Sequence, residues 1–228
     1  MFVSKILDFL FPPFCVNCQK SGSWWCDDCQ QKVEFVRGDI CAKCLKIGKH
    51  DKCGILPFDK VIAVGYYHDS VLREVITKLK FQGVFVLQNT LVDFLQKWTI
   101  SNDDYKLLQT VDAIIPMPLT KKRWRERGFN QSLILAKIFK NRLNLLAPIV
   151  DNLLVRDNID FAQSELEHNL DCRVLNVKGS FLSYEHDFNT ILLIDDVITT
   201  GATAREAARV LINKGAKKII VLTLAIGT

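Results

Sequence analysis

Two adjacent carboxylates, Asp195 and Asp196, stand where an apolar run meets a loop of small residues. Residues 191–194 before them are all apolar, and the loop after them reads Thr199-Thr200-Gly201-Ala202-Thr203. A small-residue loop that opens a helix holds an anion well, because its backbone N–H groups converge without partners and the helix dipole favours negative charge. The acids would repel that anion, yet they can accept hydrogen bonds from neutral hydroxyls. The pattern predicts a ribose 5-phosphate site, with a plain strand–turn–helix unit as the alternative.

A second candidate group is a basic run that reads Lys121-Lys122-Arg123-Trp124-Arg125-Glu126-Arg127 and is followed by Gly128. We expect a mobile cationic loop in which Arg125 or Arg127 closes on a pyrophosphate leaving group, since the guanidinium fork binds phosphate oxygens in pairs. The loop also has charge and an aromatic ring for a single-stranded nucleic acid, which makes DNA-binding candidates of Lys121, Lys122, Arg123, Trp124, Arg125 and Arg127. A solvated basic turn is the third interpretation.

Seven of the eight cysteines lie within the first 53 residues, in positions typical of metal ligands. They form pairs with two residues between the members: Cys15 and Cys18, Cys26 and Cys29, Cys41 and Cys44, and His50 with Cys53. Because such a gap turns both side chains onto one ion, the pairs predict two structural zinc sites, one with four cysteines and one with three cysteines and His50. The spacing leaves open whether the pairs combine sequentially or as an interleaved cross-brace, and a solvated His50 is the alternative to a ligand.

The elements that would position these residues alternate between strands and helices. From Asp59 onward the apolar patterns predict strand, helix, helix, strand, helix, strand, helix, strand, with a polar loop at residues 101–110. This order favours a parallel sheet with helices on both faces. The ligand is then expected at the C-terminal ends of the strands, where the loop after residue 196 meets a second loop set by Pro116 and Pro118.

Length and composition fit one α/β domain with a small appendage. The chain has 228 residues, of which 49% are apolar, and a net charge of +5 that permits contact with polyanions without requiring it. We predict a zinc-binding domain at residues 1–58 and an α/β domain at residues 59–228. No apolar run approaches the roughly 20 residues that span a bilayer, and residues 1–11 lack the features of a signal peptide. Cysteines spaced for metal rather than for disulfides indicate a reducing cytoplasm.

The run from Asp195 to Thr203 resembles the signature of the type I phosphoribosyltransferases, which bind phosphoribosyl pyrophosphate (PRPP). The resemblance implies that the two acids contact the ribose hydroxyls. It also implies that the 5-phosphate is held by Thr199, Thr200, Gly201, Ala202 and Thr203, with Val197 as a further PRPP-binding residue. The loop of Pro116, Met117 and Pro118 would hold the pyrophosphate with Mg²⁺. A transferase of this kind would work by positioning and electrostatics through Asp195, Asp196, Arg125 and Arg127, without a protein nucleophile.

Nearly the whole chain is similar to the ComF/GntX family. The similarity rests on the zinc pairs, Leu79-Lys80-Phe81-x-Gly83, Pro116-x-Pro118, Arg125-Glu126-Arg127-Gly128-Phe129-Asn130-Gln131, and the spaced Gln163, Arg173, Asn176 and Phe181. One departure is His50, where the family usually has cysteine. The resemblance implies a cytoplasmic protein of natural transformation, or of the use of DNA as a nutrient, which handles imported single-stranded DNA. A position at the periphery of the inner membrane and contact with a competence helicase or DNA-translocation channel are family-level expectations.

Three functions fit these observations. The first is a DNA-uptake protein that binds PRPP and single-stranded DNA, which we favour. The second is an active phosphoribosyltransferase that uses a nucleobase or nucleotide as acceptor. The third is a regulator that senses PRPP without turning it over.

Overall fold

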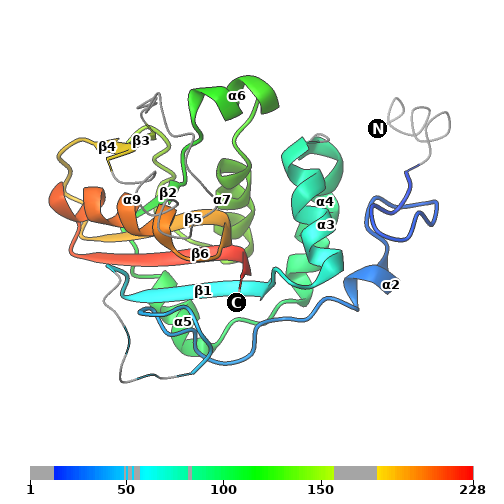
Figure 1. Ribbon diagram of the computed structural model, residues 1–228. Helices are drawn as coiled ribbons and strands as arrows, with labels where there is room; N and C mark the ends of the chain where they lie inside the picture. Colours follow the sequence, from blue (N-terminus) through cyan, green and yellow to red (C-terminus); the bar gives the residue numbers. More distant parts are fainter. Residues whose placement is uncertain are drawn as a thin grey trace, which may run out of the picture.

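The computed structural model of the protein describes residues 13–48, 50, 53, 57–81, 84–156 and 179–227 (Figure 1). The expectations for residues 1–11 and for Gln163, Arg173 and Asn176 lie outside these described residues. Within them, no helix is both long and apolar enough to cross a membrane. The predicted boundary between residues 58 and 59 stays a prediction.

A parallel sheet forms the centre of the described structure, in the strand order β1-β6-β5-β2. The strands are β1 (Lys60–Tyr66), β2 (Ala113–Pro116), β5 (Thr190–Ile198) and β6 (Lys218–Ile226). They are near-continuous apolar runs because both faces of the sheet are covered, and eight of the nine residues of β6 are buried. The prediction of a parallel α/β sheet is confirmed.

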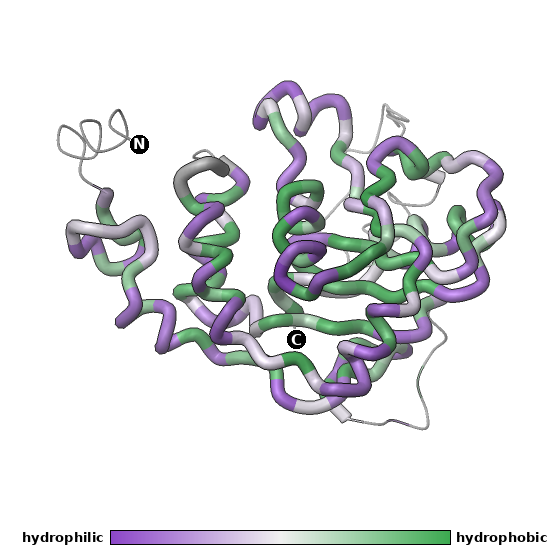
Figure 2. The backbone as a smooth tube through the Cα atoms, turned by 180° about the vertical axis from the view of Figure 1, so that it is seen from behind, coloured by the Kyte–Doolittle hydropathy of each residue, from purple (hydrophilic) through white to green (hydrophobic). Residues whose placement is uncertain are grey.

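Successive side chains of each strand point to opposite faces, so the sheet contributes to two cores. Leu192 and Leu222 belong to the core under α3 (Ser70–Phe81), α4 (Val84–Lys97) and α7 (Gln131–Arg142). Leu193 and Val221 belong to the core under α9 (Ala202–Asn213). Figure 1 shows these helices on the two sides of the sheet, and Figure 2 shows the strands mainly in the hydrophobic colour.

Two short helices replace segments for which the sequence predicts loops. At residues 101–110 the chain forms α5 (Asn102–Leu108), which begins where Ser101 Oγ accepts the N–H of Asp104 at 3.1 Å. The basic run forms α6 (Lys121–Arg127) rather than a mobile loop. Thr120 caps its start, and Gly128 ends it with a left-handed φ of 73°. No residue of α6 is buried, so an apolar stripe could not reveal the helix.

A two-stranded antiparallel sheet, β3 (Leu154–Arg156) with β4 (Phe181–Ser183), lies beside the central sheet. The cysteine-rich part includes α2 (Asp27–Gln30) and packs against α4. There the buried Trp25 ring lies 4.4 Å from the ring of Phe94, as expected for a residue that covers a junction. Lys97 Nζ, at the end of α4, adds a 2.8 Å ion pair with Asp27.

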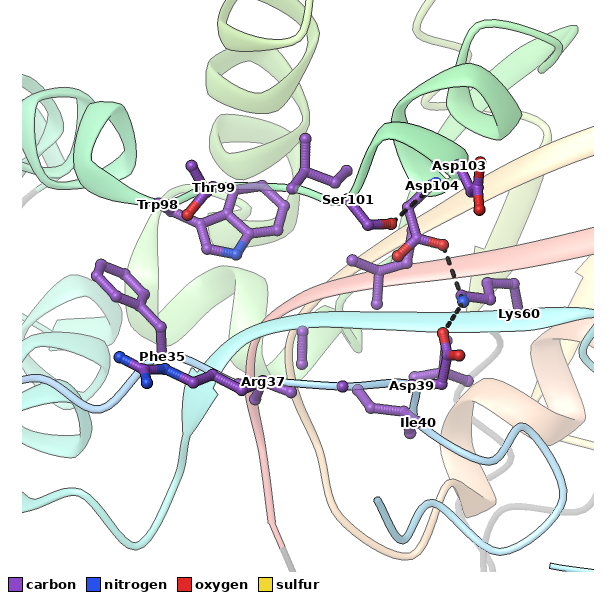
Figure 3. A pocket seen from close by; sticks show the side chains of 16 residues that line it. Phe35, Arg37, Asp39, Ile40, Lys60, Trp98, Thr99, Ser101, Asp103 and Asp104 are labelled. Carbon is purple, nitrogen blue, oxygen red and sulfur yellow. Dashed lines mark hydrogen bonds and ion pairs between the residues drawn. The ribbon is translucent and has the colours of Figure 1, made fainter. Parts of the chain in front are cut away.

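A hollow of about 680 Å³ also lies where the cysteine-rich part joins the sheet (Figure 3). Its end is closed by Lys60, whose ammonium lies 2.6 Å from Asp39 and 2.9 Å from Asp104. Burial lowers the pKa of Lys60, but the two carboxylates outweigh it and raise that pKa. The three groups connect the chain before β1, β1 itself and α5. This hollow contains none of the predicted site residues, and we assign its ion pairs to the joining of these segments.

Candidate functional site

A cleft of about 500 Å³ opens at the C-terminal ends of β2 and β5. Its walls come from the loop after β2, from α6, from the loop after β5 and from the first turn of α9. Most of the residues predicted to bind PRPP line it, namely Met117, Pro118, Asp195, Asp196, Val197, Thr199, Thr200, Ala202 and Thr203. Pro116 is instead a buried strand residue, and Gly201 is buried at the start of α9.

The acid pair is held by groups from three different elements. Asp195 Oδ1 accepts the hydroxyl of Ser132 at 3.1 Å and the N–H of Asp196 at 2.9 Å. Asp196 is 5% exposed, and its Oδ2 lies 3.0 Å from the ammonium of Lys80 at the end of α3. Burial, followed by the charge of Asp196, raises the pKa of Asp195 to about 7. Near neutral pH the pair therefore carries less than two negative charges. The ammonium of Lys80 offsets part of the remaining negative charge.

Lys80 and Ser132 are site residues that sequence reasoning missed. Lys80 belongs to a run that supports the family resemblance, but on periodicity alone it is a polar residue near a helix end. Ser132 is fully buried in the first turn of α7. Asn130 fixes this turn, because its Oδ1 accepts the N–H of Ser132 at 2.9 Å and its Nδ2 donates to the carbonyl of Met117 at 3.1 Å. The Asn130 side chain thus links α7 to the loop after β2.

The arginines of α6 fall on different faces of the helix. Arg123 and Arg127, four residues apart, line the cleft, and Arg127 Nη1 donates to Gln131 Oε1 at 3.1 Å. Arg125 does not line the cleft. Of the two arginines predicted to contact pyrophosphate, the structure brings only Arg127 to the acid pair.

Arg156, the last residue of β3, is a third cleft arginine that the sequence did not single out. Its guanidinium lies 5.2 Å from the centre of the Phe181 ring. Burial, followed by the charge of Arg123, lowers the pKa of both Arg127 and Arg156. Arg127 and Arg156, whose charges the charge of Arg123 disfavours, would be stabilised by an anionic ligand.

The loop after β5 leaves the start of α9 open to an anion. Gly201, with a φ of 71°, stands at the N-cap position and has no side chain to bond the first N–H groups of the helix. The end of β6 supports the loop closely. A Cβ on Gly227 would lie 2.8 Å from Cγ2 of Thr199. Because glycine has no Cβ, Thr199 and the loop after β5 can lie this close to position 227.

The cysteines form two clusters by sequential pairing. The sulfurs of Cys15, Cys18, Cys26 and Cys29 all lie within 4.8 Å of one another, and so do those of Cys41, Cys44 and Cys53. Tetrahedral zinc with bonds of about 2.3 Å requires sulfurs about 3.8 Å apart, so both clusters fit the ion. Burial raises the pKa of Cys15, but backbone N–H groups, first that of Cys18, outweigh it and lower that pKa to about 6. Such bonds favour the thiolate, which is the form that binds zinc.

His50 lies outside the second cluster as the structure describes it. The residue is exposed, and its Nε2 lies 3.0 Å from the carbonyl oxygen of Ile47. The structure thus brings three of the four predicted ligands together. The role of His50 as the fourth ligand stays a prediction.

Comparison with known proteins assigns both parts of the chain. Residues 6–55 match the double zinc ribbon domain, and residues 158–227 match the phosphoribosyl transferase domain. The chain is 29% identical over 217 residues to "Competence protein F" of Haemophilus influenzae, which covers 92% of this chain and 89% of the relative. It is 26% identical over 207 residues to "Competence protein ComFC" of Bacillus subtilis, covering 83% and 78% of the two chains. "DNA utilization protein YhgH" of Escherichia coli K12 is 26% identical over 218 residues, covering 86% and 94%.

The chain therefore combines a double zinc ribbon domain with a phosphoribosyl transferase domain, and most of its length is similar to proteins named for competence and DNA utilization. The two cysteine clusters lie in the part that matches the double zinc ribbon, and their donor sets suit structural zinc. The acid pair and the loop after it lie in the part that matches the phosphoribosyl transferase domain. Lys80, Ser132 and Arg127 lie before that part in the sequence and reach the same cleft through α3, α6 and α7.

Proposed function

We propose that this protein binds PRPP in the cleft at Asp195 and Asp196 and acts in the uptake and use of DNA in the cytoplasm. The observation that carries the proposal is the composition of this one cleft. It combines two acids for sugar hydroxyls, an uncapped helix start for a phosphate, and Arg123, Arg127 and Arg156 for further anionic groups.

PRPP would lie across the cleft with its groups matched to these walls. The ribose hydroxyls would donate to Asp195 and Asp196, and the 5-phosphate would accept N–H groups of residues 199–203. The pyrophosphate would lie against the loop of Met117 and Pro118 and the three arginines. Mg²⁺, brought by the pyrophosphate oxygens, would neutralise part of their charge. Lys80 would keep the acid pair from repelling so anionic a ligand.

Contact with single-stranded DNA is the second part of the proposal. Relatives named for competence and for DNA utilization suggest this ligand. Helix α6 supports it, because Lys121, Lys122, Arg123, Trp124 and Arg125 are all exposed, while Arg127 is half-buried in the cleft. Figure 2 shows α6 largely in the hydrophilic colours, projecting at the top of the view. A projecting cationic helix with an aromatic ring suits a flexible, unpaired strand.

Calorimetric titration with PRPP and Mg²⁺ tests the first part. We expect the wild-type protein to bind and the Asp196→Asn variant to lose most of its affinity. Asp93→Asn, which removes an exposed carboxylate on α4, is the matched control and should bind like the wild type. No binding to the wild type, or equal binding by Asp196→Asn and the control, would overturn the proposal.

Pyrophosphate release measured in the same samples separates the two catalytic possibilities. A transferase would release pyrophosphate from PRPP when a suitable nucleobase, nucleotide or DNA acceptor is added. A sensor would bind PRPP and release none with any acceptor. For DNA, binding of an unlabelled oligothymidylate should weaken with salt, and the salt slope should fall when Arg127 and Arg125 are both replaced with alanine.

A further inference from the structure

Helix α6 separates two hollows of the molecule. Arg123 and Arg127 line the PRPP cleft, whereas Lys121, Trp124 and Arg125 line a second hollow of about 320 Å³ on another side of the helix. We call this second hollow the α6 groove. Its other walls are residues of the loop after β2 and of the segment that leads into β3, namely Pro118, Leu119, Asp151, Leu154, Val155 and Arg156.

The α6 groove combines an exposed ring with cations and an apolar floor. Trp124 is 52% exposed, which is unusual for so large an aromatic residue. None of the residues of α6 is buried. Within the described residues Arg125 has no ion-pair partner. A tryptophan face beside a guanidinium and an ammonium is the combination that holds a nucleobase by stacking and its phosphate by charge.

The size of the groove limits its occupant. Ligand sites commonly span about 300–1,000 Å³, so a hollow of about 320 Å³ is at the lower end of that range. It suits one base with its phosphate better than a longer segment. Asp151 supplies a carboxylate that can accept from an exocyclic amino group of a base.

We propose that the α6 groove is a nucleotide subsite that takes one unpaired nucleotide of a single strand, next to but separate from the PRPP cleft. Pro118, Leu119 and Arg156 line both hollows, so the two ligands would lie on opposite sides of one shared wall. The inference rests on the single-stranded DNA contact of the proposed function, which it deepens, and it is independent of PRPP binding. It differs from a general cationic surface because it assigns stacking on the base to Trp124 alone and leaves Lys122 outside both hollows.

The test is calorimetric titration of the full-length, zinc-loaded protein and its variants with the pentanucleotide of thymidylate, with tryptophan fluorescence of the wild type as a second readout. We expect quenching in the wild type, because Trp124 is 52% exposed, whereas Trp24 is partly buried and Trp25 and Trp98 are buried. Trp124→Ala should weaken binding between about 5-fold and 150-fold, the range for loss of one base stack, and Trp124→Phe should restore most of it. Arg125→Ala should weaken binding more than Lys122→Ala, which removes an equal charge from the same helix. Circular dichroism should show all variants folded, since α6 has no buried residue.

Competition with PRPP distinguishes this subsite from the cleft. A nucleotide also carries a ribose 5-phosphate, so a strand that bound in the cleft would be displaced by PRPP. We expect PRPP not to displace the pentanucleotide, and Trp124→Ala to bind PRPP like the wild type. Displacement by PRPP, or equal pentanucleotide binding by Trp124→Ala and Lys122→Ala, would overturn the inference. If PRPP fails to bind while Trp124-dependent binding persists, the PRPP proposal fails and the nucleotide subsite stands.

Discussion

Replacement of Asp195 with asparagine is expected to stabilise the folded protein while it removes PRPP binding. Burial, followed by the charge of Asp196, raises the pKa of Asp195 from 3.8 to about 7. The folded state therefore holds the proton more tightly than the unfolded state, so the free energy of unfolding falls as the pH rises from about 4 to about 7. At about 1.4 kcal/mol per pH unit, this proton linkage lowers the free energy of unfolding, relative to its value at low pH, by about 4 kcal/mol at pH 8 and by about 2 kcal/mol at pH 5.5.

Asparagine removes this cost and keeps an oxygen that can accept the Ser132 hydroxyl and the N–H of Asp196. The assay is urea unfolding of zinc-loaded protein at pH 5.5 and pH 8, with Asp93→Asn as the control. The advantage of Asp195→Asn over the wild type should grow by about 2 kcal/mol between the two pH values, and the control should show no such growth. An advantage that stays constant or shrinks as the pH rises would refute the assigned pKa and its cause.

Three further predictions concern the second zinc site, the loop after β5 and the packing of the cysteine-rich part against α4. His50→Ala should speed zinc release from one of two sites, measured with a chromogenic chelator; equal release from both proteins would remove His50 as a ligand. Gly227→Ala should weaken PRPP binding in calorimetry about 10- to 100-fold, because the new Cβ forces Thr199 to move, while the midpoint of thermal unfolding changes little. Trp25→Ala should reduce the free energy of unfolding in urea by about 3–5 kcal/mol, since a 1% exposed ring leaves a cavity against Phe94; a loss below 1 kcal/mol would contradict that packing.

Strong local signals in the sequence correspond to long elements of the structure. The apolar runs of β5 and β6 predict buried parallel strands, and Asp69 predicts the start of α3, where its Oδ1 accepts the N–H groups of Val71 and Leu72 at 2.9 Å each. The apolar pattern does not predict helices α5 and α6, because each has only seven residues and α6 has no buried side chain. The only sequence signals for α5 and α6 are the capping residues Ser101 and Thr120, and such residues are also common in turns.

The missed site residues show a different limit. Ser132 and Asp195 are 63 positions apart, and their 3.1 Å hydrogen bond depends on the packing of α7 against β5. Lys80 reaches Asp196 from the end of α3, and Arg156 reaches the cleft from β3. None of these contacts has a fixed spacing in the sequence. A motif can therefore identify the two acids and the small-residue loop after them. The cations that would reduce the repulsion between these acids and an anionic ligand come together only through the fold.

The placement of cations around the acid pair bears on how the two proposed ligands, PRPP and DNA, would be kept apart. Lys80 offsets charge within the pair, and Arg123 and Arg127 face the cleft from one side of α6. Trp124 and Arg125 face the α6 groove from another side. Because neighbouring residues of a helix point in different directions, one seven-residue helix can present separate contacts to two anionic ligands. Double replacement of Arg123 and Arg127 should therefore weaken PRPP binding more than pentanucleotide binding, and Trp124→Ala should do the reverse. Equal losses for both ligands in both variants would mean that α6 acts as a single cationic surface.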